Sequence, residues 1–408
     1  MENLRRLGIY ITGNRCANFF PCASKNAASD LENVLKWHNR FRPTSGQKRL
    51  FIVVVDDESN NDLYKTIKQK FDKNGIINQV VKVGVLRNIK VFTYRTDSAS
   101  KNEDFSFNLA LSINSKLGGT NCLPTDDPFD LWTKEVNSNE LIMFIGIDTK
   151  LSAQKKKLGV VAISASINNN GTRFNNFAMM TNGFQKYCSD YKNALFYALD
   201  AYEGADKNRS RFPRKIVIFR AGMNDYELTK GEGFLERSHI KSVIDQYMFE
   251  KRLQQKPLIT YIGYNRSNGV RFYVKNMESR VRALTSNTDP EGAKLNVPPG
   301  TVIDNEITNP NCFYFISHKT LMGTTKVAKY TIVDDEIRFK ADNLLAVVYQ
   351  LCRLMPQTKR SYRRPIPIGL TEKVLKWCTL VEPDIYDERR QNESINIHPD
   401  FVNCLYFI

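Results

Sequence analysis

The 408-residue chain contains no uninterrupted apolar run of the roughly 20 residues that a membrane-spanning helix needs. Its first residues lack the basic segment and apolar core of a secretory signal, so we expect none. The eight cysteines are scattered without Cys-x-x-Cys spacing, and the four histidines are dispersed. This pattern argues against a zinc site and a disulfide framework, and it predicts reduced thiols in a cytoplasmic or nuclear protein.

Acidic residues are fewer than basic ones. The chain has 59 Lys and Arg against 43 Asp and Glu, a formal net charge of +16. A basic excess of this size favours binding to phosphates, because a cationic surface that neutralises them releases their counterions. Charge alone does not distinguish a nucleic-acid binder from a merely basic protein.

The order of predicted elements is typical of an α/β protein. Apolar runs predict strands and helical spacing predicts helices, with Gly118 following the last helix as a C-cap signal. The predicted strands are Leu7–Ile11, Leu50–Val55 and Gln79–Val85, and the predicted helices are Ala27–Phe41, Tyr64–Lys73 and Phe107–Leu117. An acidic segment with two prolines, Pro124–Pro128, predicts a linker. We therefore expect two domains, residues 1–130 and 131–408.

A buried-strand pattern near the middle of the chain, Met143–Thr149, carries Asp148 towards its end. RNase H-type nucleases place a carboxylate in this way, as one of several that hold two divalent cations about 3.5–4 Å apart. The next comparable strand runs through Ile216–Phe219 to Arg220-Ala221-Gly222. The question is whether the other ligands of such a site are present.

These two strands and the motifs after them resemble the PIWI domain of Argonaute proteins. In that family the second strand ends Arg-Asp-Gly, and later motifs follow in the same order and spacing as in this chain. The matching segments are Gly300–Asp304, Phe313–His318, Gly323–Thr325 and Tyr349–Cys352. The resemblance implies an RNase H-like PIWI domain preceded by a Rossmann-like MID domain, and covers nearly the whole chain. Argonautes also carry an N-terminal and a PAZ domain, so we expect a MID-PIWI fragment.

The resemblance also implies where an Argonaute catalytic set, Asp-Glu-Asp with His or Asp, would lie. The first Asp is Asp148, whereas Ala221 stands at the third position and Glu372 near the fourth. The second member is a mobile Glu, and where it should lie the chain has Gln185 or Lys186 instead. Each hard cation requires several oxygen ligands, so we expect no protein-bound metal and no target cleavage.

Two other functions remain open. One is an active slicer in which Asp148 and a non-standard acid, such as Glu372 or Asp304, hold the metal. The other is an interaction scaffold that retains the fold but no longer binds RNA. The missing ligands look similar to the worm-specific branch of Argonautes, many of which lack the catalytic set.

The first domain resembles the Argonaute MID domain, which holds the 5′ phosphate of a guide RNA. Tyr64 matches the Tyr that stacks on the first base, and Lys68, one helical turn later, matches a phosphate-binding Lys. Gln79 and Lys116 match two further pocket residues, while Ser112 replaces a family Lys. The resemblance implies a guide phosphate pocket with one positive charge fewer, for a mono- or triphosphate end. A magnesium ion at that phosphate is the one cofactor considered.

Three further features follow from the resemblance. The chain ends Leu405-Tyr406-Phe407-Ile408, and the terminal carboxylate of Ile408 is expected beside the phosphate pocket. Where the family has an Arg that reaches the phosphate, the chain has Lys376 or Trp377. Basic residues in PIWI segments are expected along the guide backbone: Arg266, Arg271, Arg353, Lys359, Arg360, Arg363 and Arg364.

The loop before Tyr64 is expected to read the first guide base. It is unusually acidic, and a carboxylate from Asp56 or Asp57 could accept both donors on the edge of guanine. A loop simply turned to solvent is the alternative. The expected partners are a small guide RNA, its complementary target RNA and silencing-effector proteins, in RNA-mediated gene silencing.

Overall fold

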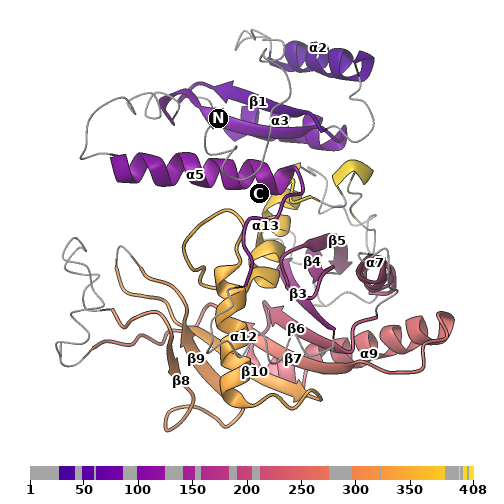
Figure 1. Ribbon diagram of the computed structural model, residues 1–408, viewed down its shortest axis with the longest axis vertical. Coiled ribbons are helices and arrows are strands. Elements are labelled where there is room, and N and C mark those ends of the chain that lie inside the picture. The colour runs from indigo at the N-terminus through magenta and orange to yellow at the C-terminus, as the bar shows by residue number, and fades with distance from the viewer. Residues whose placement is uncertain are drawn as a thin grey trace.

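The computed structural model of the protein is shown in Figure 1. It describes residues 27–41, 48–58, 61–85, 99–124, 141–151, 158–182, 191–204, 212–274, 296–320, 323–381, 395, 398–401 and 404–408. No helix within these ranges is long and apolar enough to cross a membrane.

The described residues of the N-terminal part include a pair of parallel strands and several helices. They are α2 (Ala27–Arg40), β1 (Leu50–Val55), α3 (Asn61–Lys73), β2 (Ile77–Lys82) and α5 (Ala99–Lys116). Strands β1 and β2 pair from Leu50 with Ile77 to Val55 with Lys82. Apolar residues spaced three and four apart on α2 and α3, such as Ile67 and Phe71, bury one face of each helix against the strands.

The predicted elements of this part are largely confirmed, with shifted ends. The strand predicted at Gln79–Val85 begins instead at Ile77, whose side chain is buried, and ends at Lys82. The prediction was wrong beyond Lys82, because the Gly84 amide donates to Asp57 and the chain turns away into a helical stretch, 83–85. The last helix ends as expected, with Gly118 at φ 86°. Segment 7–11 and the domain boundary near 130 lie outside the described residues.

The C-terminal part is built on an eight-stranded mixed sheet with the order β5-β4-β3-β6-β7-β10-β9-β8. Strands β3, β6 and β7 are parallel, and the other pairs are antiparallel. The strands are β3 (Ile142–Leu151), β4 (Leu158–Ser166), β5 (Phe174–Asn182), β6 (Lys215–Ala221), β7 (Leu258–Asn265), β8 (Thr301–Ile303), β9 (Cys312–Ile316) and β10 (Ala328–Asp335).

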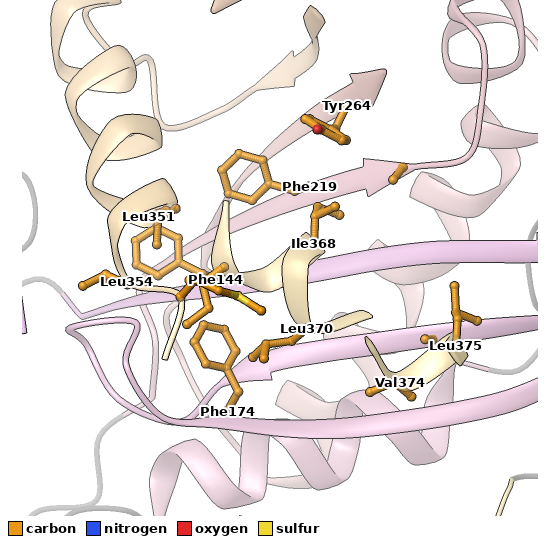
Figure 2. Packing of buried hydrophobic residues seen from close by; sticks show 14 of the residues in the cluster. Phe144, Phe174, Phe219, Tyr264, Leu351, Leu354, Ile368, Leu370, Val374 and Leu375 are labelled. Carbon is orange, nitrogen blue, oxygen red and sulfur yellow. The ribbon is translucent and has the colours of Figure 1, made fainter. Parts of the chain in front are cut away.

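Helices cover both faces of this sheet. They are α7 (Lys192–Glu203), α8 (Asp225–Thr229), α9 (Glu232–Glu250), α12 (Ala341–Arg353) and α13 (Ile366–Val381), and a 3-10 turn, η3, spans Pro399–Phe401. Helices α12 and α13 share one core with the sheet, and α7 and α9 share the other. Figure 2 shows the first core, where Phe144, Phe219 and Leu351 are fully buried. Burying each such side chain contributes about 1.5–3 kcal/mol.

Helix α13 connects the two parts of the molecule. Its start lies so close to β3 that a Cβ at Gly146 would come 2.4 Å from the Pro367 carbonyl carbon, so only glycine fits there. Its later turns pack against α3 of the N-terminal part, where Trp377 hydrogen-bonds Asp72. The C-terminus lies beside α5 in Figure 1. Asp72 and Trp377, which are 305 positions apart in the sequence, therefore meet where α3 packs against α13.

Candidate functional site

Two lysines are buried where the N-terminal part meets α13. Lys68 of α3 and Lys116 at the end of α5 expose 4% and 2% of their surface. Nζ of Lys116 donates to Gln79 Oε1 at 2.7 Å and to the Asn78 carbonyl at 3.1 Å. Nζ of Lys68 is buried and has no hydrogen-bond acceptor among the described residues. Burial lowers the pKa of Lys68, and burial together with the Lys68 charge lowers that of Lys116 well below its usual value, although the Asp72 charge opposes both changes.

The negative charge between these lysines belongs to Asp72, which lies one helical turn after Lys68. Its two carboxylate oxygens accept hydrogen bonds from neutral donors, Trp377 Nε1 and Asn78 Nδ2, both at 2.7 Å. Burial raises the pKa of Asp72, although the Lys68 charge and both hydrogen bonds oppose that rise. We refer to Lys68, Asp72, Gln79, Lys116 and Trp377 as the lysine pocket.

Tyr64 lies on α3 one turn before Lys68, with 40% of its surface exposed. Its ring can therefore receive a flat ligand. The Ser112 hydroxyl donates to the carbonyl of Asn108 in its own helix, so it supplies no charge to the pocket. Ser112 and Gln79 also line an open groove of 370 Å³ between β2 and α5.

The C-terminal tail is docked beside the lysine pocket. The Leu405 amide donates to the Ser115 carbonyl of α5 at 3.1 Å. The Tyr406 ring stacks on Phe401 and meets Trp377 edge to face, with ring centroids 5.0 Å apart for the latter pair. Ile408 follows as a partly buried last residue. Lys376, in contrast, is exposed, so of the two residues predicted near the family Arg only Trp377 enters the pocket.

The acidic loop after β1 is exposed at both Asp56 and Asp57. Oδ1 of Asp57 accepts a hydrogen bond from the backbone amide of Gly84 at 2.9 Å. The backbone carbonyl of Asp57 accepts one from Lys82 Nζ at 3.0 Å. One carboxylate oxygen of Asp57 is thus already engaged, which leaves the other for a ligand.

The two strand ends of the expected catalytic set are neighbours in the sheet. The paired register of β3 and β6 ends with Ile147 opposite Arg220, so Asp148 and Ala221 follow side by side. Asp148 is 2% exposed, and its Oδ1 accepts the Thr149 amide at 2.8 Å. Gln185 and Lys186, near the expected position of the missing Glu, lie outside the described residues.

Arginines surround the carboxylates of this degenerate centre, which we define as Asp148, Ala221 and Glu372. Nη1 of Arg266 lies 3.9 Å from Asp148 Oδ2 and 3.8 Å from Glu372 Oε1, and Arg364 pairs with the other oxygen of Glu372. Burial raises the pKa of Asp148, an effect that the charges of Arg266 and Arg220 oppose. Asp304 is exposed, and the described ranges contain no cluster of three or more Asp, Glu, His or Cys that could hold a metal.

A buried ion pair lies beneath the degenerate centre. Arg220 and Glu236 are fully buried, and Arg220 Nε donates to Glu236 Oε1 at 2.8 Å. Glu236 also accepts the hydroxyl groups of Tyr191 and Tyr261, at 2.9 and 2.6 Å. Arg220 Nη2 donates to Thr149 at 3.0 Å. This network fixes the ends of β3 and β6 relative to α9.

Four of the predicted backbone-binding residues gather beside the degenerate centre. Burial lowers the pKa of Arg363, and the charges of Arg364, Arg271 and Arg266 lower it further. Burial with the charges of Arg363 and Arg364 lowers the pKa of His318 to about 4, so this imidazole is neutral at pH 7. Of the other predicted backbone-binding residues, Lys359 lies over the Phe107 ring of α5, and Arg353 and Arg360 are exposed.

A family model of the Piwi domain matches residues 50–379 of this chain. The chain belongs to the Argonaute/Piwi family. Protein tag-76 of Caenorhabditis elegans is 26% identical over 331 residues, 79% of this chain and 29% of tag-76. Argonaute-2 of Drosophila melanogaster is 28% identical over 391 residues, 90% of this chain and 29% of that protein. The chain therefore spans less than a third of either relative.

Solved structures show the same fold for this Argonaute/Piwi chain. The Kluyveromyces polysporus Argonaute with a guide RNA superimposes with a TM-score of 0.76 at 20% identity, over 100% of this chain and 47% of that one. The predicted mixed α/β class, with an RNase H-like PIWI fold, is thereby confirmed. The match to a worm protein agrees with the predicted similarity to the worm-specific branch.

Sequence reasoning missed several residues of the Argonaute/Piwi site. Asp72 was within reach, because it lies four residues after Lys68 and so on the same helix face. The Arg220–Glu236 pair gives no sequence signal beyond two charges in apolar surroundings. The contact between Trp377 and Asp72 joins two parts of the chain, and no local pattern could have assigned it.

Proposed function

We propose that this chain binds the 5′ phosphate of a guide RNA in the lysine pocket. The observation that carries the proposal is the Lys68 ammonium group, which is buried and has no hydrogen-bond acceptor among the residues that the structure describes. A buried cation of this kind is costly unless a ligand compensates it. A terminal phosphate, with a charge of about −1.5 to −2 and three acceptor oxygens, supplies both the charge and the hydrogen bonds.

The surroundings of the lysine pocket fit the rest of a guide strand. Tyr64 gives an exposed aromatic face, on which any first base can stack. Arg266, Arg271, Arg363 and Arg364 provide a positive cluster for backbone phosphates further along. The similar Kluyveromyces polysporus structure contains a guide RNA, which supports an RNA ligand here.

A magnesium ion at the guide phosphate does not fit the described residues as its holders, since no cluster of three ligating side chains occurs among them. Such an ion would be held mainly by RNA oxygens, and the proposal includes no step through it. Target RNA and silencing effectors remain proposed partners of the whole protein.

We infer further that the chain does not cleave a paired target. At the degenerate centre, Ala221 has no ligand oxygen, and Arg266 lies between the Asp148 and Glu372 carboxylates. A guanidinium at this position neutralises the carboxylates and opposes a second cation there. The alternative, a slicer using Asp148 with Glu372 or Asp304, predicts guide-dependent cleavage with magnesium or manganese, and its observation would overturn our inference. Ala221→Asp alone should not restore cleavage.

The test of guide binding is a titration of two RNAs that differ only at the 5′ end. Lys68→Ala and Lys116→Ala should each weaken binding of 5′-phosphorylated RNA by about 1.5–3 kcal/mol, the range for hydrogen bonds to charged groups. A 5′-hydroxyl RNA should lose much less. Lys192→Ala, at an exposed surface pair, is the matched control. If both pocket variants bind the phosphorylated RNA like the unmodified protein, the pocket assignment is wrong. That result would favour the alternative of an interaction scaffold that no longer binds RNA.

A further inference from the structure

Asp72 is an anion inside a pocket that we propose for another anion. It lies four residues after Lys68 on α3, a spacing at which an aspartate and a lysine ordinarily face each other. Both groups are buried, Lys68 to 4% and Asp72 to 3% exposure, and attraction between opposite charges is strong where water is excluded. Nevertheless, the Lys68 ammonium has no hydrogen-bond acceptor among the described residues.

The carboxylate of Asp72 is held by two neutral donors from elsewhere. Trp377 Nε1 donates to Oδ2 and Asn78 Nδ2 donates to Oδ1, each at 2.7 Å. Asn78 is itself fixed, since its Nδ2 also donates to the Ile76 carbonyl at 3.0 Å. Two tethers on opposite oxygens fix the direction of the carboxylate.

Trp377 can act as a tether because its own position is fixed by the fold. It projects from α13 and is 7% exposed, and the Tyr406 ring of the docked tail packs edge to face against it. The indole thus reaches into the N-terminal part from the C-terminal part of the chain. Its N–H has no charge, so it restrains Asp72 without competing for a phosphate.

We propose that Trp377 is a positioning residue that keeps the Asp72 carboxylate turned away from Lys68, so that the Lys68 ammonium stays available to the guide phosphate. This inference rests on the proposed function. In the absence of the indole N–H, Asp72 Oδ2 rotates towards Lys68 and pairs with it. A phosphate must then displace an internal carboxylate before it binds.

The decisive variant is Trp377→Phe, which removes the N–H donor and keeps an aromatic ring for Tyr406. We expect affinity for 5′-phosphorylated RNA to fall about 10-fold, the effect of one hydrogen bond to a charged group. Affinity for the matching 5′-hydroxyl RNA should change less than twofold, so the ratio between the two RNAs falls. Trp37→Phe, on α2 and outside the lysine pocket, is the control for loss of an indole.

The second variant removes the competing anion. In the double variant Trp377→Phe with Asp72→Asn, phosphate discrimination should return at least to that of the unmodified protein. Asp72→Asn alone keeps Trp377 and should bind 5′-phosphorylated RNA several-fold more tightly, because one negative charge beside the phosphate is lost. Weaker binding by Asp72→Asn would overturn the inference even if Trp377→Phe does not fold, because Asp72 would then not compete with the phosphate.

The outcomes separate the inference from the function beneath it. If Lys68→Ala weakens binding of 5′-phosphorylated RNA while Trp377→Phe leaves the ratio of affinities for the two RNAs unchanged, the guide pocket is supported. In that case the role proposed for Trp377 is wrong. Failure of Asp72→Asn to rescue the double variant, or weaker binding by Asp72→Asn alone, also overturns that role. If Lys68→Ala does not change the affinity for 5′-phosphorylated RNA, the proposed function itself is wrong.

Discussion

The lysine pocket and the degenerate centre are both buried charged sites, but their charges are arranged in opposite ways. In the lysine pocket two ammonium groups surround one carboxylate, and the Lys68 ammonium has no acceptor among the described atoms. In the degenerate centre the Asp148 carboxylate has Arg266 within 3.9 Å and Arg220 within electrostatic range. The lysine pocket thus has more cations than anions, whereas the carboxylates of the degenerate centre have arginine cations nearby.

The difference indicates which site retains a ligand. Folding tolerates a desolvated, unpaired charge poorly, so such a charge persists where a ligand compensates it. A carboxylate that arginines already neutralise has lost the need for a divalent cation. We therefore associate the lysine pocket with binding and the degenerate centre with structure and phosphate contact. The following predictions test this contrast, from the largest effect to the smallest.

The largest expected effect is at the ion pair under the degenerate centre. Glu236→Gln leaves the Arg220 guanidinium buried without a full counter-charge, which should lower the free energy of unfolding by about 3–5 kcal/mol. Urea unfolding followed by circular dichroism measures it. Glu250→Gln is the control, because its pair with Lys192 is exposed and should contribute no more than about 1 kcal/mol. If both substitutions lower the free energy of unfolding by the same small amount, the Arg220–Glu236 pair does not have the structural role assigned to it.

The lysine pocket should show the opposite sign for stability. Lys68→Met removes a buried cation that has no acceptor in the described part of the chain and keeps about the volume of the side chain, so we expect a gain of about 1–3 kcal/mol in the free energy of unfolding. The same protein should bind 5′-phosphorylated RNA more weakly. A variant that is less stable without RNA would show that Lys68 has a structural role instead.

In the acidic loop before Tyr64, a smaller effect tests whether an exposed carboxylate reads the first base. We predict a preference for guanine of about 1 kcal/mol, the lower end for a bidentate contact, because Asp57 Oδ1 already accepts the Gly84 amide. Competition among four 5′-phosphorylated RNAs, differing only in the first base, measures it. Single changes of Asp56, Asp57 and Asp62 to Ala identify the acceptor, and a guanine preference unaffected by all three would exclude a carboxylate.

The smallest effect concerns pH and Asp148. Burial raises the pKa of this carboxyl in the folded state, so the folded protein holds the proton more tightly than the unfolded chain. Stability from this group is therefore greatest at low pH and is lost as the pH rises through the folded-state pKa. Asp148→Asn should raise stability at neutral pH by up to about 1 kcal/mol, and the gain should shrink on acidification.

The control for the pH prediction is the same change at exposed Asp304. Because the Asp304 side chain is exposed, this substitution should change the free energy of unfolding by no more than about 0.5 kcal/mol. A gain at Asp148 that grows on acidification would mean that the arginine charges outweigh burial. If the protein cleaved a paired target RNA with a divalent metal and Asp148→Asn abolished that cleavage, the degenerate centre would be catalytic and its contrast with the lysine pocket would be wrong.

Local patterns were enough to predict much of the fold. The strand Leu50–Val55 is confirmed residue by residue, because six consecutive β-branched or apolar residues suit a strand and little else. The start of α5 was placed eight residues too late, since Ala99–Ser106 has few apolar residues to mark a helical face. The end of β2 was misplaced because a contact with Asp57, distant in the sequence, turns the chain.

Spacing and motif order in the sequence are enough to predict the α/β class, the membership of the Argonaute/Piwi family and the helical pairing of Tyr64 with Lys68. These features are short-range, and a linear chain displays them directly. Which charges are compensated depends instead on three-dimensional packing. The hydrogen bond from Trp377 to Asp72, the place of Arg266 between two carboxylates and the lack of an acceptor for Lys68 among the described residues all depend on distances between segments far apart in the chain. Because electrostatic energies depend on those distances and on burial, spacing alone could not assign them.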